Sequence, residues 1–339
     1  MKMKLLYIIP HRNCNPSRQK NITMALNWLT LAKKKFTEEK SQIIFDVAVV
    51  EQASEPDFNG KQWGIKEIYL FNPGVFNKGW AFNVVVKQYP DYDYYIFADG
   101  DIIYPDIESF YQQITLLCQT QPQPAFRLFK ECLDTNPTDL LNCNDVGSLI
   151  DLYNNGKLTL VKRYGLTFAG GTIAISRATY DKIGGWDEQF EGWGRHDDFM
   201  TLKLFKLGHC EKIIAPLSGI HLWHPIMPDF SLKQPTILLY NEVSKYSVEQ
   251  LTDLIEKNHP LIGNPLKYRI LNKPTVVAQS KPAPVPAKIS LVVPAQTSTP
   301  VPAKTSLGVP AKISTPVPAK ISTPVPDKKL PIIVNPDQV

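Results

Sequence analysis

Residues 1–273 alternate between short strand-like apolar runs and segments with helical apolar spacing, and this alternation constrains the fold more than any other feature. The expected strands are Leu5–Ile9, Ile43–Val50, Ile65–Phe71, Tyr94–Ala98 and Thr172–Ser176. The expected helices are Ile22–Lys35, Ala81–Lys87, Ser109–Gln119 and Asp197–Leu207, the last with Gly208 at its C-terminal cap. Alternation of this kind is typical of an α/β domain.

The C-terminal segment 274–339 has a different composition. It holds 14 of the 29 prolines and no Phe, Trp or Tyr, so it cannot bury enough apolar surface to offset its ordering entropy. An octapeptide beginning Val-Pro recurs six times, at valines 285, 293, 301, 309, 317 and 325. We therefore expect a disordered tail with polyproline II character, serving as a spacer or as a docking arm for an unknown partner.

The formal net charge of +5 comes entirely from that tail. Residues 274–339 contain seven Lys and two Asp, whereas residues 1–273 contain 30 basic and 30 acidic side chains. Nucleic-acid binding needs a concentrated basic face, so a nucleic-acid partner is not expected.

The apolar runs and the cysteines indicate in which cellular compartment the protein is expected. No apolar run approaches the ~20 residues that a membrane-spanning helix needs, and Leu5–Ile9 is too short for a signal peptide. The five cysteines are odd in number and lack C-x-x-C spacing, which favours reduced thiols. We therefore expect no transmembrane segment and a cytoplasmic location.

Asp99, Gly100 and Asp101 follow directly on the apolar strand Tyr94–Ala98. Open α/β folds bind ligands at the carboxyl edge of the sheet, and residues i and i+2 of an extended segment project to the same side. Two carboxylates there suit Mg²⁺ or Mn²⁺ holding a diphosphate. Capping of a turn is the alternative.

A glycine-rich block with two tryptophans extends from Phe168 to Asp198. Trp186 and Trp193 offer flat apolar faces to a sugar ring, and the glycines leave room near the backbone. Asp197 and Asp198 are expected at the start of a helix, where capping by itself would explain one of them. The block is typical of a carbohydrate site; core tryptophans beside a capped helix are the alternative.

His221 and His224 lie three residues apart. Neutral imidazoles at this spacing can converge on Mn²⁺ and complete a metal site begun by Asp101. Two packed histidines are the alternative.

Five segments together resemble the β-1,4-galactosyltransferase family over residues 4–230. They are Tyr7–Asn13, Phe76–Asn83, Phe97–Ile102, Phe168–Gly171 and Gly192–Asp198. The resemblance implies a GT-A (nucleotide-diphospho-sugar transferase) fold over residues 1–273, with a mixed, mostly parallel sheet flanked by helices. The donor half would span about 1–125 and the acceptor and catalytic half about 126–240. A UDP-sugar donor, Mn²⁺ (or Mg²⁺), a carbohydrate or glycoconjugate acceptor and inversion are also implied.

The resemblance assigns roles residue by residue. The donor-binding residues would be Pro10, His11, Arg12, Asn77, Lys78, Asp99, Asp101 and Trp193, with Arg12 at the phosphates. The metal ligands would be Asp101, His221 and His224, where the family has methionine at the first histidine. The acceptor-binding residues would be Gly171, Trp193, His196, Asp197 and Asp198. Residues 126–165 carry no prediction beyond an acceptor-side insertion.

Besides His221, five positions depart from the family pattern. His11 replaces an aromatic residue, Lys78 an arginine, Arg195 a glycine, His196 a glutamate and Phe199 an aspartate. Lysine keeps the charge of arginine but loses its bidentate fork, so the donor sugar stays open between the galactose and N-acetylgalactosamine types. The acceptor pocket is also expected to differ.

The functional hypothesis is an inverting glycosyltransferase in which Asp197 takes the proton of the acceptor hydroxyl. A HAD-like phosphatase, whose nucleophile is the first Asp of an Asp-x-Asp motif, is one alternative. Phosphatases of that kind usually carry the motif near the N-terminus, whereas 98 residues precede Asp99. The other alternative is a non-catalytic sugar-binding module.

Overall fold

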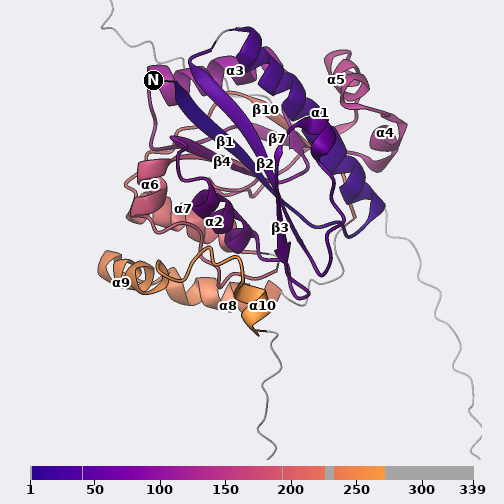
Figure 1. The fold of residues 1–339 in the computed structure, drawn as a ribbon. Coiled ribbons are helices and arrows are strands. Elements are labelled where there is room, and N and C mark those ends of the chain that lie inside the picture. The colour runs from indigo at the N-terminus through magenta and orange to yellow at the C-terminus, as the bar shows by residue number, and fades with distance from the viewer. Residues whose placement is uncertain (1, 40, 193, 226–232, 272–339) are drawn as a thin grey trace, which may run out of the picture. The chain divides into compact units, whose positions relative to one another are not determined.

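The computed structural model describes residues 2–39, 41–192, 194–225 and 233–271 (Figure 1). Trp193 and the predicted tail 274–339 lie outside the described residues. Contacts divide the chain into Met1–Val276 and Val277–Val339, and the account below concerns the first unit. The predicted division into donor and acceptor halves stays a prediction.

The larger sheet has the strand order β3-β2-β1-β4-β9-β6. Its strands are β1 (Met3–His11), β2 (Ile43–Ala53), β3 (Lys66–Phe71), β4 (Tyr94–Ala98), β6 (Ala125–Arg127) and β9 (Thr172–Ser176). Strands β1 to β4 are parallel, and β9 runs antiparallel to both of its neighbours. The predicted α/β class, with a mixed and mostly parallel sheet, is confirmed.

Alternate residues of β1 face two apolar cores, because successive side chains of a strand point to opposite faces. Leu5 and Tyr7 pack in the core that includes the buried residues of α1 (Pro16–Glu38) and α3 (Ile107–Thr115). Leu6 and Ile8 pack in the core on the other face. That core includes buried residues of α2 (Lys78–Gln88), α6 (Arg177–Lys182) and α7 (His196–Lys206). Helices therefore cover both faces of the sheet (Figure 1).

A smaller sheet has the order β5-β10-β7-β8. Its strands are β5 (Ile102–Ile103), β7 (Glu131–Thr135), β8 (Leu160–Lys162) and β10 (Ser218–His221), and α4 (Pro137–Asn142) and α5 (Val146–Asn154) connect β7 to β8. Residues 126–165, predicted only as an insertion, thus supply two of these strands. The residues of β8, at the edge of this sheet, are half-buried or exposed.

The last described helices are α8 (Lys233–Val243), α9 (Val248–Asn258) and α10 (Lys267–Leu271). They lie beside α2 and α7 (Figure 1), and Val243, Leu251 and Tyr268 are buried in the same core as α2. A single turn of 3₁₀-helix, Lys61–Trp63, precedes β3, and a π-helical turn, Leu116–Thr120, continues α3.

The structure bears on two predictions: that the cysteines are reduced and that the chain has no transmembrane segment. All five cysteines are free, and Cys14 is exposed. Among the described residues, no helix has both the length and the apolar character needed to cross a bilayer. The cytoplasmic location stays a prediction.

The observed helix boundaries differ from those predicted by apolar spacing, because capping residues set them. Helix α1 begins at Pro16, because the side chain of Asn15 accepts a hydrogen bond from the backbone N–H of Arg18 (2.9 Å) and proline is favoured in the first turn. Gly208 lies at the C-terminal end of α7 as predicted: it follows the C-cap Leu207, and its backbone N–H donates to the carbonyl oxygen of Lys203 (3.0 Å). The positive φ falls at His209 (51°), while an added Cβ on Gly208 would lie 2.6 Å from the carbonyl oxygen of Leu204.

Candidate active site

The carboxyl end of β4 carries the first of the two predicted carboxylates. The backbone N–H of Asp99 donates to the carbonyl oxygen of Gly171 (2.9 Å), where β9 begins. Gly171 has φ 82°, and a Cβ there would lie 2.9 Å from Cδ1 of Ile102. Only glycine fits this position without strain, so Gly171 contributes to the site by holding Asp99 in place.

The expectation that Asp99 and Asp101 project to the same side as members of one extended segment was wrong. The strand ends at Ala98, and the chain turns at Gly100 and Asp101. The two carboxylates consequently meet different partners: Asp99 contacts Lys78, while Asp101 lies among histidines.

Asp101, His221 and His224 converge, as predicted for a metal site. Nε2 of His224 lies 3.3 Å from Oδ2 of Asp101, and Nε2 of His221 lies 3.5 Å from Oδ1. One ligand atom from each residue lies within 4.8 Å of the others. The backbone sets this arrangement, because Leu222 N donates to the carbonyl oxygen of Asp101 (2.7 Å) and Asn21 Nδ2 donates to that of Leu222 (3.0 Å).

The chemistry of this cluster fits a divalent cation. Asp101 is 2% exposed, yet its Oδ1 has no hydrogen-bond partner among the described residues. A buried acceptor without a donor is costly, and a metal ion would satisfy it. Burial opposes the negative charge of Asp101, but His221, His224 and Arg18 outweigh it and lower the pKa of the carboxyl.

Arg18, in the first turn of α1, is a site residue that the motifs did not identify. Its Nη1 forms an ion pair with Oδ2 of Asp101. The Asn15-Pro16 start of α1 was the signal that would have located it, since that cap places Arg18 one turn from the end of β1. Arg18 adds a positive charge beside the candidate metal site.

Lys78 connects Asp99, at the end of β4, with Asp197, in the first turn of α7. This lysine is buried, and its Nζ lies 2.7 Å from Oδ1 of Asp99 and 3.1 Å from Oδ1 of Asp197. Burial disfavours its charge, but Asp197 and Asp99 more than offset burial, so the pKa of Lys78 lies above its usual value. A residue predicted to bind the donor therefore also fixes the predicted base.

The first turn of α7 presents the predicted acceptor-side residues. His196, Asp197 and Asp198 begin the helix, and its N-cap Arg195 has φ 60° and forms no side-chain cap. Asp198 is paired with Arg195 (3.0 Å), and His196 Nε2 lies 3.8 Å from Oδ1 of Asp197. Burial lowers the pKa of His196, so its imidazole is neutral at pH 7.

Asp197 has the electrostatics of an ionised carboxylate. Burial raises the pKa of its carboxyl group. The charge of Lys78, the electrostatic effect of His196 and the hydrogen bond from Lys78 together lower the pKa by more than burial raises it, so the net shift is downward. Its backbone carbonyl accepts from Oγ1 of Thr201 (2.8 Å), within α7. The side chain is thus held in one place and charged at neutral pH.

The predicted donor loop follows β1, with Pro10 and His11 as its last residues. His11 is buried edge-on against Phe58 (5.5 Å between ring centroids), and its Nε2 has no partner among the described residues. Arg12 donates to three backbone carbonyls, those of Gln52 (2.7 Å), Gly74 (2.7 Å) and Asn72 (3.1 Å). In this structure Arg12 thus ties the ends of β2 and β3 together.

Asn77 and Trp186 have structural contacts. The Asn77 side chain caps α2 by accepting from Trp80 N (2.9 Å) and donates to the carbonyl oxygen of Glu188 (2.8 Å). Trp186 is 1% exposed and packs against Phe82 (5.1 Å between centroids). The interpretation of Trp186 as a sugar-stacking face was therefore wrong: it is a core residue.

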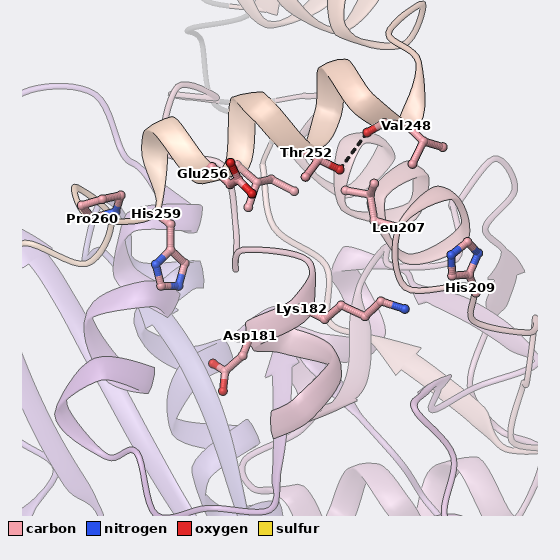
Figure 2. A pocket seen from close by; sticks show the side chains of 10 residues that line it. Asp181, Lys182, Leu207, His209, Val248, Thr252, Glu256, His259 and Pro260 are labelled. Atoms are coloured by element: carbon pink, nitrogen blue, oxygen red, sulfur yellow. Dashed lines mark hydrogen bonds between the residues drawn. The ribbon is translucent and has the colours of Figure 1, made fainter.

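A groove of about 620 Å³ lies elsewhere, where α9 passes over α6 and the end of α7 (Figure 2). Lys182 and His209 line it on one side, and Thr252 and Glu256 of α9 line it on the other. None of the predicted site residues is among its lining residues. The groove is separate from the candidate active site.

Residues 157–218 match the family model described as the N-terminal domain of galactosyltransferase. The matched segment contains Gly171, His196, Asp197 and Asp198, whereas Asp101 and the two histidines lie outside it. The resemblance to galactosyltransferases is confirmed over this segment, and the observed mixed sheet between helices is the architecture that the resemblance implies. Among curated proteins, none matches the sequence significantly.

Glycosyltransferases are among the solved structures that match this chain. One is a mutant Drosophila β-1,4-galactosyltransferase 7 with manganese, UDP-Gal and xylobiose, at 14% identity and TM-score 0.38. This match covers 63% of the present chain and 65% of that one, so the chain spans less than two thirds of the relative. Another is glucosyl-3-phosphoglycerate synthase from Mycobacterium tuberculosis with Mn²⁺, UDP-Glc and phosphoglyceric acid, at 13% identity and TM-score 0.44, covering 71% and 80%.

Proposed function

We propose that this protein is a nucleotide-sugar glycosyltransferase that moves a hexose of the galactose or N-acetylgalactosamine type from a UDP-sugar to an acceptor hydroxyl, with inversion. The observation that carries the proposal is the bridge from Lys78 to both Asp99 and Asp197, which joins the candidate base to the strand end that leads to Asp101. The family match over the segment that contains Asp197 supports it.

Asp197 is the proposed catalytic base. The acceptor oxygen attacks the anomeric carbon while Oδ of Asp197 takes its proton, and the bond between that carbon and the UDP oxygen breaks. The bonding electrons leave with UDP, so no covalent enzyme intermediate is needed. Because the pKa of Asp197 is lowered, the carboxylate is ready at neutral pH but weakly basic, and positioning must supply much of its effect.

Asp101, His221 and His224 are the residues that would hold Mn²⁺ (or Mg²⁺). A divalent cation there would supply charge neutralisation for the departing diphosphate. Arg18, paired with Asp101, lies where it can also contact a phosphate oxygen. His11, whose Nε2 has no partner in the part of the chain that the structure describes, and Arg12 border the proposed nucleotide side.

Release of UDP from a panel of UDP-sugars tests the proposal. With the full chain and Mn²⁺, we expect release from one or two sugars and its loss in Asp101→Ala. Asp197→Asn should lower transfer by about 10² or more, since general-base catalysis typically contributes 10²–10⁴-fold, while UDP binding stays nearly unchanged. Retained turnover in Asp197→Asn would remove this residue from the base role.

Two further measurements, of UDP binding and of phosphatase activity, separate the other two predicted functions. UDP binding without release, with or without acceptor sugars, would favour a non-catalytic sugar-binding module. Release of inorganic phosphate from a phosphomonoester, abolished in Asp99→Asn, would favour a HAD-like phosphatase. The contact of Asp99 with Lys78 disfavours the second outcome, because a paired carboxylate is a poorer nucleophile.

A further inference from the structure

His221 lies in an unusually defined electrostatic environment. Strand β10 pairs in parallel with β7, and the register places His221 directly beside Asp134. Nδ1 of His221 lies 3.0 Å from Oδ1 of Asp134, and Nε2 faces Oδ1 of Asp101 at 3.5 Å. The imidazole therefore stands between two carboxylates, one on each ring nitrogen.

Arg163 holds the outer carboxylate. Its Nε donates to Oδ1 of Asp134 (2.8 Å), and its Nη2 lies 2.9 Å from Nδ1 of His221. Two proton placements on His221 are therefore conceivable. Either Nδ1–H donates to Asp134, or Nδ1 accepts from Arg163 and the proton sits on Nε2.

The geometry at Asp101 distinguishes these placements. A proton on Nε2 would point at Oδ1 of Asp101, but that oxygen has no hydrogen-bond partner among the described residues, and the contact of 3.5 Å is longer than a good hydrogen bond. A proton on Nδ1 has an acceptor at 3.0 Å in Asp134. It also leaves the Nε2 lone pair free to bind a cation held between the ring and the carboxylate of Asp101.

We propose that Asp134 is a positioning residue that holds His221 in its Nδ1–H form and thereby makes the Asp101, His221 and His224 site selective for Mn²⁺ over Mg²⁺. The inference rests on the metal site of the proposed function. A carboxylate behind a ligating histidine fixes the ring and raises its basicity.

Selectivity follows from the number of nitrogen ligands. Mg²⁺ prefers oxygen ligands and keeps most of its water, whereas imidazole suits transition metals. With His221 as a second imidazole ligand beside His224, two of the three protein ligands are nitrogen. Without Asp134, the competing contact from Arg163 would take up the Nδ1 lone pair and place the proton on Nε2, which leaves one nitrogen ligand.

Direct metal binding by the full chain, without nucleotide, tests this inference. Electron paramagnetic resonance measures free Mn²⁺, and competition with Mg²⁺ measures the preference. We expect the unchanged protein to bind Mn²⁺ at least tenfold more tightly than Mg²⁺, and Asp134→Asn to lose about 10-fold or more in Mn²⁺ affinity with little change for Mg²⁺. Glu131→Gln, in the same strand, is the matched control and should keep the affinity.

The proton on His221 has its own readout. Nitrogen NMR of the metal-free protein should show the Nδ1–H form in the unchanged chain and in Arg163→Met, and the Nε2–H form in Asp134→Asn. Equal Mn²⁺ affinity in Asp134→Asn and the unchanged protein would overturn the inference and leave the glycosyltransferase proposal standing. Absence of Mn²⁺ binding to the unchanged protein would overturn the inference together with the metal site, whereas UDP release in the presence of EDTA would then show whether transfer itself survives.

Discussion

At the scale of single residues, Lys78 controls the charge state of the proposed base. Because Lys78 lowers the pKa of Asp197, removing its charge in Lys78→Met leaves burial as the main influence and raises that pKa. A smaller fraction of Asp197 is then ionised at a given pH. We expect the acidic limb of the kcat/KM profile for transfer to move to higher pH.

Lys78→Arg separates this charge effect from loss of the side chain. Arginine keeps the positive charge between Asp99 and Asp197, so the acidic limb should stay where it is even if KM changes. An identical shift in both variants would show that the position of the limb does not depend on the charge.

His11 should make the fold sensitive to acid. Burial, followed by the nearby charge of Arg18, lowers its pKa to about 4, against about 6.5 in an unfolded chain. The unfolded state therefore binds more protons between those values, and stability is complete above pH 6.5 and falls as pH drops towards 4. The loss should reach about 3 kcal/mol, at about 1.4 kcal/mol per pKa unit.

Urea unfolding of His11→Phe across pH 4–7 measures this contribution. The variant should lack the His11 component of the pH dependence. His259→Gln changes an exposed histidine and should leave the profile as in the unchanged protein. A profile that is equally steep in His11→Phe would assign the acid sensitivity to other groups.

At the scale of elements, the junction between β4 and β9 depends on one glycine. Gly171 and Gly156 both have positive φ, 82° and 63°, but an added Cβ meets Ile102 at 2.9 Å in the first and nothing within 4 Å in the second. Gly156→Ala should cost roughly 1–2 kcal/mol of unfolding free energy from backbone strain. Gly171→Ala should cost about 1–3 kcal/mol more from overpacking.

The same pair of variants tests the link from packing to function. The carbonyl oxygen of Gly171 accepts a hydrogen bond from the backbone N–H of Asp99, so a shift of residue 171 would also move Asp99. UDP release should therefore fall in Gly171→Ala and stay unchanged in Gly156→Ala. Equal unfolding midpoints for the two variants would mean that the chain near Ile102 relaxes around the added methyl group.

Elements also show what apolar spacing predicts and what it leaves out. Each strand predicted in the larger sheet was found within a few residues, because β-branched and aromatic runs report burial directly. Helix starts were missed where polar caps set them: Asn15 began α1 before Ile22, and Asn77 began α2 before Ala81. Capping is a hydrogen bond to the backbone, to which apolar periodicity is blind.

At the scale of the whole molecule, the candidate metal site connects two sheets. Asp101 leaves β4 of the larger sheet, and His221 ends β10 of the smaller one. A cation bound only by the folded chain stabilises it by about 2.7 kcal/mol at a concentration 100 times Kd. Saturating Mn²⁺ should therefore raise Tm by roughly 5 °C or more.

Thermal unfolding of the full chain with Mn²⁺ or EDTA checks this expectation. Asp101→Ala removes the buried carboxylate and should abolish the difference between the two conditions. An equal rise in the variant would show that Mn²⁺ binds elsewhere.

The sequence by itself determined the α/β class, the strand that leads to Asp99 and Asp101, and the residues that form the candidate metal site. These follow from local properties: apolar runs predict buried strands, and carboxylates and imidazoles at strand ends have ligand chemistry whatever surrounds them. Apolar spacing also located Asp197 at the start of a helix, within one residue of the observed start of α7.

Only the tertiary structure decided which side chains meet. Lys78 lies 119 positions from Asp197 along the chain, Asp134 lies 87 from His221, and Arg18 lies 83 from Asp101. Contacts over such separations depend on strand order and register, which burial patterns do not specify. The same holds for Trp186. A tryptophan side chain can either stack on a sugar ring or pack in a core, and only the tertiary contact with Phe82 shows that Trp186 packs in the core.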